Sequence, residues 1–218
     1  MSSPIIPEGA YSYEFLEEVE SEVSGKIQVL FNPVWGITIR TGKTTQSGGD
    51  LTKTFKEPLL WVKNRELNAK TCLILGFGSG TVAQLIENLW EGIKITGVEI
   101  DPLMLSLGEK YFNLDKKRYE IKIMDADKYL KKVLGKQKFD IIIADIYVGD
   151  NVPEIFDSEK FFRKLSKIIN KNGFVLVNRL FRGNYIIKAK FTTGEIKKVF
   201  KKIVPLFSRK NVLLACSF

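Results

Sequence analysis

Histidine is missing from this chain of 218 residues, and cysteine is scarce. The absence of histidine removes the commonest general base, so any proton transfer must fall to Asp, Glu, Tyr or Lys. The two cysteines, Cys72 and Cys216, both lie in apolar, strand-like runs. This placement favours buried thiols over a disulfide framework, and it predicts no metal site.

Long apolar runs are missing as well. No segment approaches the roughly 18 consecutive apolar residues that a membrane-spanning helix needs. Residues 1–10 lack the basic stretch followed by an apolar stretch that is typical of a secretory signal. We therefore expect a cytoplasmic protein that does not enter a membrane.

Positive charge is present in excess, with a formal net charge of +9. Lysines gather at 131–138 and at 197–202. A basic surface can meet nucleic acid or an acidic partner. These segments lack interleaved aromatic residues of the kind that stack on bases, so a solvated helix face is the favoured interpretation and nucleic acid is not the expected partner.

The order of the apolar runs predicts an α/β protein. Residues 1–10 are expected to form a flexible tail, 11–54 a small antiparallel β-sheet with a polar loop at 41–51, and 55–218 a cofactor-binding domain. Strands are expected at 71–75, 94–99, 119–124, 139–144 and 173–178, helices at 80–90, 102–112, 126–134, 158–170 and 190–202, and a closing hairpin at 203–207 and 212–216. This alternation predicts a seven-stranded, mostly parallel sheet with a reversed C-terminal strand and helices on both faces.

The most informative stretch is residues 71–101, in which an apolar run ends at Gly76, Gly78 and Gly80 and a second apolar run ends at Glu99. Glycines let a ligand approach the main chain, and an acid about 20 residues later is placed to accept hydrogen bonds from ribose hydroxyls. The dinucleotide pattern Gly-x-Gly-x-x-Gly needs its third glycine one residue later, where this chain has Thr81. The stretch therefore favours another adenosine-containing cofactor. The alternative is a tight turn that binds nothing.

Acidic residues follow two further strands. Asp125, with Ala126, is placed to contact an adenine ring, and the alternative is a helix N-cap. Asp145 ends the apolar run 139–144, where desolvation can tune its pKa, so it is a candidate general base or partner of a cationic group. Its alternative role is to accept hydrogen bonds from loop amides. Tyr147 either lines the acceptor pocket or packs within the loop.

These segments resemble the spermidine synthase-like branch of the class I S-adenosylmethionine (SAM) dependent methyltransferases, which have a Rossmann-like fold. The resemblance runs from about Tyr13 to the C-terminus and is carried by TTQSGG (44–49), LILGFGSG (73–80), GVEID (97–101) and FDIIIADIYVGDNVP (139–153). It implies a nucleoside site, chemistry between the small sheet and the main domain, and a homodimer. The cofactor contacts that we predict are Gln46, Gly76, Phe77, Gly78, Ser79, Gly80, Glu99, Ile100, Asp125 and Ala126. The resemblance also matches Asp145 to the base that helps deprotonate the attacking amine.

Three departures from this family's pattern concern the binding of cations. Ser79 stands where aminopropyltransferases have an Asp that holds the aminopropyl end of decarboxylated SAM, and its hydroxyl can instead donate to the carboxylate of intact SAM. Val148 replaces the second Asp of an Asp-x-x-Asp motif that grips the diamine. Phe55 replaces a Tyr, and we expect it in the substrate pocket together with Tyr147. Because a buried cationic amine needs carboxylate partners, these differences favour intact SAM over its decarboxylated form.

The leading hypothesis is a SAM-dependent methyltransferase with a small-molecule acceptor and Asp145 as the catalytic residue. One alternative is a polyamine aminopropyltransferase with an altered amine pocket, and another is a non-catalytic nucleoside-binding protein. Nucleic-acid methylation depends only on the lysines, because the Asn/Asp-Pro-Pro-Tyr/Phe motif of amino methylases is replaced by Asp145-Ile146-Tyr147-Val148.

Overall fold

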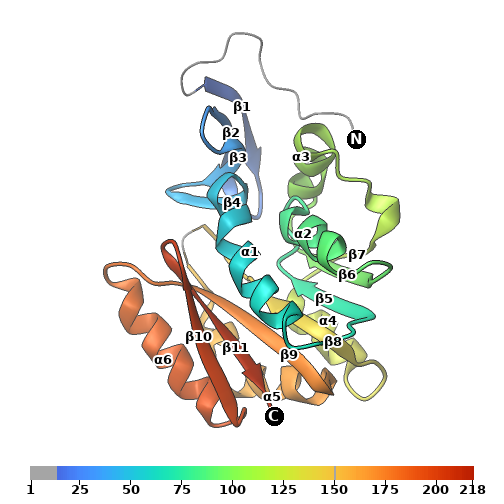
Figure 1. Ribbon diagram of the computed structural model, residues 1–218. Helices are drawn as coiled ribbons and strands as arrows, with labels where there is room; N and C mark the ends of the chain where they lie inside the picture. The colour runs from blue at the N-terminus through green and yellow to red at the C-terminus, as the bar shows by residue number, and fades with distance from the viewer. Residues whose placement is uncertain (1–13, 150) are drawn as a thin grey trace.

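The computed structural model describes residues 14–149 and 151–218 and contains two β-sheets (Figure 1). The smaller is an antiparallel meander of β1 (Glu14–Ser21), β2 (Gly25–Asn32), β3 (Gly36–Thr41) and β4 (Thr44–Gly48). The flexible tail predicted for residues 1–10 lies outside the described residues.

The larger sheet has seven strands in the order β10-β11-β9-β8-β5-β6-β7. Its strands are β5 (Thr71–Leu75), β6 (Lys94–Glu99), β7 (Glu120–Ile123), β8 (Phe139–Ala144), β9 (Ile169–Leu180), β10 (Lys202–Ser208) and β11 (Asn211–Ser217). Strand β11 is antiparallel to both of its neighbours, and the other pairs are parallel. The predicted fold, a Rossmann-like class I methyltransferase sheet with a small N-terminal antiparallel sheet, is confirmed.

Helices cover both faces of the larger sheet, because its central strands are apolar on both sides. The helices are α1 (Gly49–Lys63), α2 (Thr81–Leu89), α3 (Pro102–Phe112), α4 (Ala126–Val133), α5 (Glu159–Ile168) and α6 (Tyr185–Lys197), with short 3-10 turns η1 (Lys116–Arg118) and η2 (Glu154–Asp157). In β5, Leu73 and Leu75 pack with α4, α5 and α6, whereas Cys72 and Ile74 pack with α1 and α2. Both Cys72 and Cys216 are buried free thiols, as predicted.

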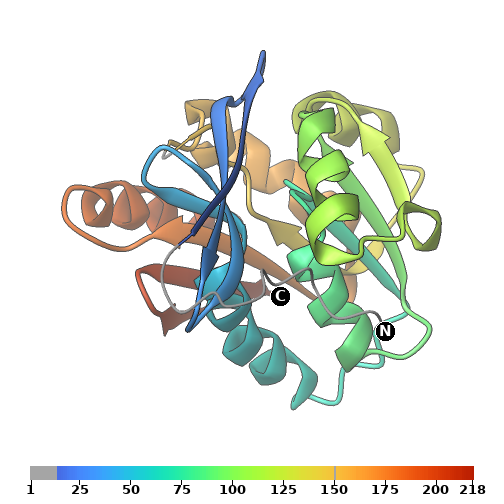
Figure 2. The same cartoon turned by 90° about the horizontal axis from the view of Figure 1, so that it is seen from above.

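The small sheet has one apolar face and one polar face. The residues Ile27, Val29 and Ile39 pack onto α3, as period-2 alternation requires of side chains on one side of a strand. The opposite face includes Leu30 and Thr38 and borders the cavity described below. Figures 1 and 2 show this sheet across one end of the larger sheet, between α3 on one side and the β10–β11 hairpin on the other.

Hydrogen bonds fasten the small sheet to the rest of the chain. They join Ser21 to Asp101 at 2.6 Å, Ser47 to Ser79 at 2.8 Å, Gly48 to Thr81 at 2.8 Å and Gln46 to Gly149 at 3.0 Å. Helix α1 starts directly after β4, at Gly49. The boundary that the sequence suggested between residues 54 and 55 therefore falls inside this helix.

Two other local predictions differ from the structure in whole or in part. The loop expected at 41–51 contains β4 and the start of α1, because its polar strand pairs with β3 and its buried Ser47 hydroxyl accepts a hydrogen bond from the Ser79 amide. The helix expected at 190–202 is present, but its bounds differ, since α6 runs from Tyr185 to Lys197 and β10 begins at Lys202. Across residues 14–149 and 151–218, the structure contains no helix with the length and apolar character needed to cross a membrane.

Candidate active site

A cavity of about 510 Å³ lies where the ends of β5, β6 and β8 meet the small sheet. Such a volume is typical of a site for a small molecule, for which the usual range is roughly 300 to 1,000 Å³. The larger sheet reverses its strand order between β5 and β8, since the chain first builds outward to β6 and β7 and then returns to β8. Ligands of open α/β sheets bind at this switch point, beyond the carboxyl ends of the strands.

The glycine turn after β5 supplies room for a ligand. Gly76 and Gly78 line the cavity. Gly76 has a φ of 84°, and a Cβ there would lie 2.1 Å from the carbonyl oxygen of Asp145, so only glycine fits.

The amides of this turn already have partners within the protein. The N–H groups of Gly76 and Phe77 donate to Val98 O, that of Gly78 to Glu99 Oε2, that of Ser79 to Ser47 Oγ and that of Gly80 to Phe77 O, over 2.7 to 3.2 Å. Glycine turns that bind phosphate present unpaired amides to it. This turn therefore fits a ligand without a phosphate at that point.

Three of the predicted cofactor contacts do not line the cavity. The ring of Phe77 is buried against Gly97 and Tyr119, and Gly80 lies against Leu114. Ser79 is fully buried, and its hydroxyl donates to Met104 O in α3 over 2.7 Å.

The placement of Ser79 corrects one step of the sequence argument. Because Ser79 is fully buried, does not line the cavity and donates its hydroxyl to Met104 O, it is not placed to meet the carboxylate of SAM. The sequence pattern located the turn, but it could not tell which way this small side chain points.

Glu99 ends β6, lines the cavity and is held by three backbone amides. Its carboxylate accepts from Gly78 N at 2.7 Å, Ile100 N at 2.8 Å and Asp101 N at 3.0 Å. Burial raises the pKa of Glu99, and the amides oppose that rise. A carboxylate has about four acceptor positions, so three amides leave about one for a ligand hydroxyl. Ile100 also lines the cavity.

Asp125 and Ala126 line the cavity next to Glu99. Asp125 is the N-cap of α4, and its Oδ1 accepts from Lys128 N over 2.9 Å. The N-cap alternative is thus correct. It is compatible with a ligand contact, because a carboxylate that accepts one backbone bond retains further acceptor positions.

Asp145 follows β8 at the switch point and lines the cavity. It accepts a hydrogen bond from Asn178 Nδ2 over 2.8 Å. Burial raises the pKa of Asp145 to about 6, against the lowering effects of Asn178 and of the Arg179 charge, and Glu99 adds to the rise. A carboxylate with such a pKa is suited to proton transfer near neutral pH. The sequence did not identify Asn178 as its partner, although its place at the end of the strand expected at 173–178 was a usable signal.

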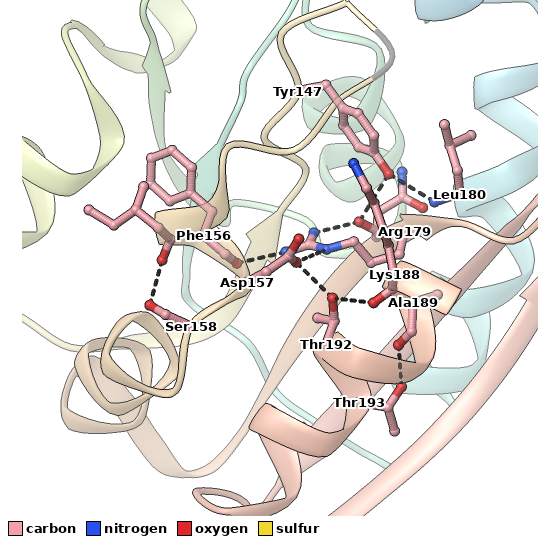
Figure 3. Close-up of polar contacts among 12 residues, drawn as sticks. Tyr147, Phe156, Asp157, Ser158, Arg179, Leu180, Lys188, Ala189, Thr192 and Thr193 are labelled. Atoms are coloured by element: carbon pink, nitrogen blue, oxygen red, sulfur yellow. Dashed lines mark hydrogen bonds and ion pairs between the residues drawn. The ribbon is translucent and has the colours of Figure 1, made fainter. Parts of the chain in front are cut away.

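A buried ion pair supports this side of the cavity (Figure 3). Arg179 donates from Nε to Asp157 Oδ1 and from Nη1 to Asn178 O, each over 2.7 Å, and from Nη2 to Phe156 O over 2.8 Å. Thr192 of α6 also donates to Asp157 Oδ1, over 2.7 Å. Arg179 therefore joins η2 to the strand that carries the partner of Asp145. No sequence motif indicated this network.

Tyr147 lines the cavity, and its hydroxyl forms hydrogen bonds with the backbone of β9. It accepts from Leu180 N over 3.0 Å and donates to Asn178 O over 3.3 Å (Figure 3). Burial raises the pKa of Tyr147 far above its ordinary value, so the hydroxyl stays neutral. Both alternatives for Tyr147, a cavity wall and a packed loop aromatic, are thus compatible with its position.

The other predicted pocket residues differ in their placement. Phe55 is fully buried in the core between α1 and the sheet and does not line the cavity, so its predicted place in the substrate pocket is corrected. Gln46 does line the cavity, and its Nε2 donates to Thr41 Oγ1 over 2.7 Å and to Gly149 O over 3.0 Å. Val148, which stands where the resemblance implied a missing carboxylate, lines the cavity with 45% of its surface exposed.

Comparison with known families matches residues 58–210 to the spermine/spermidine synthase domain. The chain belongs to this family. The probable polyamine aminopropyl transferase of Bifidobacterium longum is 27% identical over 171 residues, which are 78% of this chain and 36% of that protein. The chain thus spans about a third of the length of this curated relative.

Methyltransferases are also among the relatives. The eEF1A lysine and N-terminal methyltransferase homolog of Drosophila melanogaster is 28% identical over 121 residues, which are 52% of this chain and 18% of that protein. This chain is therefore similar to proteins named for each of two kinds of group transfer.

Solved structures agree on the fold. Spermidine synthase from Thermotoga maritima superposes with a TM-score of 0.74 at 21% identity, over 93% of this chain and 72% of that one. Human methyltransferase-like protein 13 in complex with SAH superposes with a TM-score of 0.66 at 22% identity, over 78% of this chain and 82% of that one. The chain thus has a spermidine synthase-like scaffold that methyltransferases share.

Proposed function

We propose that this protein is a SAM-dependent methyltransferase for a small-molecule acceptor, with Asp145 as the general base or acceptor-orienting group. Glu99 and Asp125 are suited to hold the ribose and the adenine ring, because both carboxylates border the cavity and retain acceptor positions. The occupied amides of the glycine turn support a nucleoside without a phosphate there.

The observation that carries the proposal is the composition of the cavity lining near Asp145. Apolar Val148 lines the cavity where the family resemblance implies a second carboxylate. An aminopropyltransferase must desolvate a cationic amine, and each missing carboxylate partner costs about 2 to 5 kcal/mol of binding. Val148 presents an apolar surface there. With Val148 in place of a second carboxylate beside it, Asp145 is better suited to an acceptor that loses one proton than to a diamine with two charges.

The residues of the cavity have separate tasks in this reaction. SAM, when bound, supplies an electrophilic methyl group. Glu99 and Asp125 orient the nucleoside, Gly76 and Gly78 leave room for it, and Asp145 takes the proton of the acceptor. Since methyl transfer needs in-line approach, positioning supplies much of the rate.

The direct test is to incubate the protein with SAM and a panel of small acceptors and to follow nucleoside release and acceptor mass. We expect S-adenosylhomocysteine together with an acceptor heavier by one methylene unit. The Asp145→Asn variant should bind SAM and give little product. If no acceptor is methylated while decarboxylated SAM and a diamine react, the proposal is contradicted.

An aminopropyltransferase is the second candidate, because relatives such as the Bifidobacterium longum protein carry that name. It predicts release of methylthioadenosine from decarboxylated SAM in the presence of a diamine. The same panel distinguishes the two candidates, since their nucleoside products differ.

A further inference from the structure

Charges are segregated along the edge of the cavity. The three acids Glu99, Asp125 and Asp145 end or follow β6, β7 and β8, on one half of the seven-stranded sheet. Arg182 follows β9, and Lys210 lies in the turn between β10 and β11, on the other half. The main chain holds these two cationic segments together, since Phe181 N donates to Lys210 O over 2.7 Å.

The small sheet adds two more cations to the cavity lining, Arg40 in β3 and Lys43 in the turn before β4. Alternation along β3 explains the direction of Arg40. Ile39 packs onto α3, so its neighbour Arg40 faces the opposite side, together with Thr38. In Figure 1 the β10–β11 turn rises toward this sheet, and all four cations belong to the lining of the same cavity.

These four cations have no carboxylate within ion-pair distance among residues 14–149 and 151–218, whereas Lys26 and Lys110 pair with Glu18 and Glu17. Asp50, in the first turn of α1, is the one acid of this half that lines the cavity, within the described part of the chain. The half of the cavity beyond Asp145 is therefore rich in cations that lack an ion-pair partner within the described part of the chain.

The mouth on this side is also positive. Trp35 lines the cavity, and Lys53 Nζ lies 4.1 Å from the centre of its ring. The guanidinium carbon of Arg209 lies 4.9 Å from the same centre. These side chains add positive potential at the entrance, which attracts an anion and repels a polyamine.

We infer that the acceptor is an anion, which carries a carboxylate or a phosphate that Arg40 and Arg182 bind while its nucleophilic atom lies at Asp145. This inference rests on the proposed function and names the substrate class of the same site. Arginine suits the task because its guanidinium forms two parallel hydrogen bonds with a carboxylate or phosphate. Two arginines and two lysines exceed what the single carboxylate of SAM needs.

Calorimetric titration tests the anion site with two probes, inorganic phosphate and succinate. Each is titrated into the protein alone and into the protein saturated with S-adenosylhomocysteine. We expect at least one probe to bind in both states, and the better probe indicates which anionic group the acceptor carries. The Arg40→Gln and Arg182→Gln variants should each weaken binding about 10-fold or more, as the loss of a charge-assisted hydrogen bond predicts.

Matched variants show whether the effect belongs to the cavity. Arg65→Gln removes the same charge from an exposed residue after α1, where the side chain bonds Trp61 O, and should leave probe affinity unchanged. Arg40→Lys keeps the charge and should restore part of the affinity. If neither probe binds the wild-type protein, or if Arg40→Gln and Arg182→Gln have no more effect than Arg65→Gln, the inference is overturned.

Titration with S-adenosylhomocysteine separates this inference from the proposed function. We expect each of the two cavity variants to lose much less affinity for it than for the probe, because the lysines and the remaining arginine still favour its carboxylate. If each variant loses as much affinity for S-adenosylhomocysteine as for the probe, the arginines bind the cofactor's own carboxylate. That result would overturn only the inference of an anionic acceptor. If the wild-type protein fails to bind S-adenosylhomocysteine while phosphate still binds at Arg40 and Arg182, the proposed function is the part that fails.

Discussion

The two halves of the cavity are built in different ways. On the side of β6 and β7, the main chain fixes the carboxylates, since Glu99 accepts three backbone amides and Asp125 caps α4. On the side of β9 to β11, side chains such as Arg40 and Arg182 reach the cavity from separate segments and have no ion-pair partner among the described residues. Because backbone hydrogen bonds hold the carboxylates of the first half and no ion pair among the described residues holds the cations of the second, we expect single substitutions in the second half to change specificity more readily.

Asp145 lies where these halves meet, and its removal should have the largest effect on turnover. We expect Asp145→Asn to lower the rate about 100-fold or more, which is the usual contribution of a general base. In the wild-type protein the rate should rise as pH increases through about 6, where Asp145 loses its proton, and the variant should lack this inflection. Rates measured from pH 5 to 8 check this, with exposed Asp115→Asn as control. Unchanged turnover in Asp145→Asn would contradict the assigned role.

The same variant should have a measurable effect on stability. The folded-state pKa of Asp145 is about 6 and lies above the ordinary value of 3.8, so the folded state holds this proton more tightly. Its contribution to stability is present below pH 4 and is lost as pH rises through 6. Asp145→Asn should therefore raise the free energy of unfolding at pH 8 by about 1 to 3 kcal/mol, and by little at pH 4. Urea unfolding at both pH values measures it.

Arg179 supports the point where the two halves meet, because it donates to the carbonyl oxygen of Asn178, the hydrogen-bond partner of Asp145. We expect Arg179→Met to destabilise the fold by about 3 to 5 kcal/mol, because it leaves Asp157 buried without its partner. Loss of the positive charge should also raise the pKa of Asp145, so the acid limb of the pH–rate profile should move to higher pH. Arg163→Met removes an exposed ion pair with Glu159 and should cost less than about 1 kcal/mol. Equal effects of the two variants would contradict the supporting role.

A substitution at Glu99 should affect only the half of the cavity beside β6 and β7. In Glu99→Gln the amide group offers one acceptor oxygen to three backbone N–H groups, so the geometry of the proposed ribose site is distorted. We expect affinity for SAM to fall about 10- to 100-fold, the loss expected for hydrogen bonds to a charged group. Affinity for phosphate should stay the same, since its site lies in the other half. Calorimetry with both ligands checks this, with exposed Glu91→Gln as the control.

Ser79 should have the smallest effect on the cofactor. Its hydroxyl donates to Met104 O inside the protein, so Ser79→Ala should cost about 1 kcal/mol of stability. We expect affinity for SAM to change less than about 3-fold, because a hydroxyl that does not reach the cavity contributes no direct hydrogen bond. A large loss of SAM affinity without a loss of stability would return Ser79 to the cofactor site.

The acidic half of the cavity could be predicted from the sequence, because its residues directly follow regular strands. Strand ends are visible as apolar runs followed by Gly76, Glu99, Asp125 and Asp145, and the topology of a parallel sheet brings such residues together. The fold class followed from the same alternation. The direction of individual side chains did not follow, and for that reason Ser79 was assigned to the cavity although it is buried in the interior.

The cationic half of the cavity could not be predicted, because no local sequence pattern indicates which lysines and arginines line it. Arg40 and Lys43 are far in the chain from Arg182 and Lys210, and only the packing of the small sheet and the β10–β11 hairpin brings them to one cavity. Strand β4 was also missed, since its polar sequence lacks the alternation of a half-buried strand. Phe55 was assigned from resemblance alone, and the amphipathic packing of α1 turns it into the core.

The most direct measurement compares the affinities of intact and decarboxylated SAM by calorimetry. The decarboxylated form lacks a carboxylate and carries an additional net positive charge toward a half of the cavity that is already cationic. We predict that intact SAM binds at least about 10-fold more tightly, which corresponds to about 1.4 kcal/mol. Tighter binding of decarboxylated SAM would contradict the proposed methyltransferase.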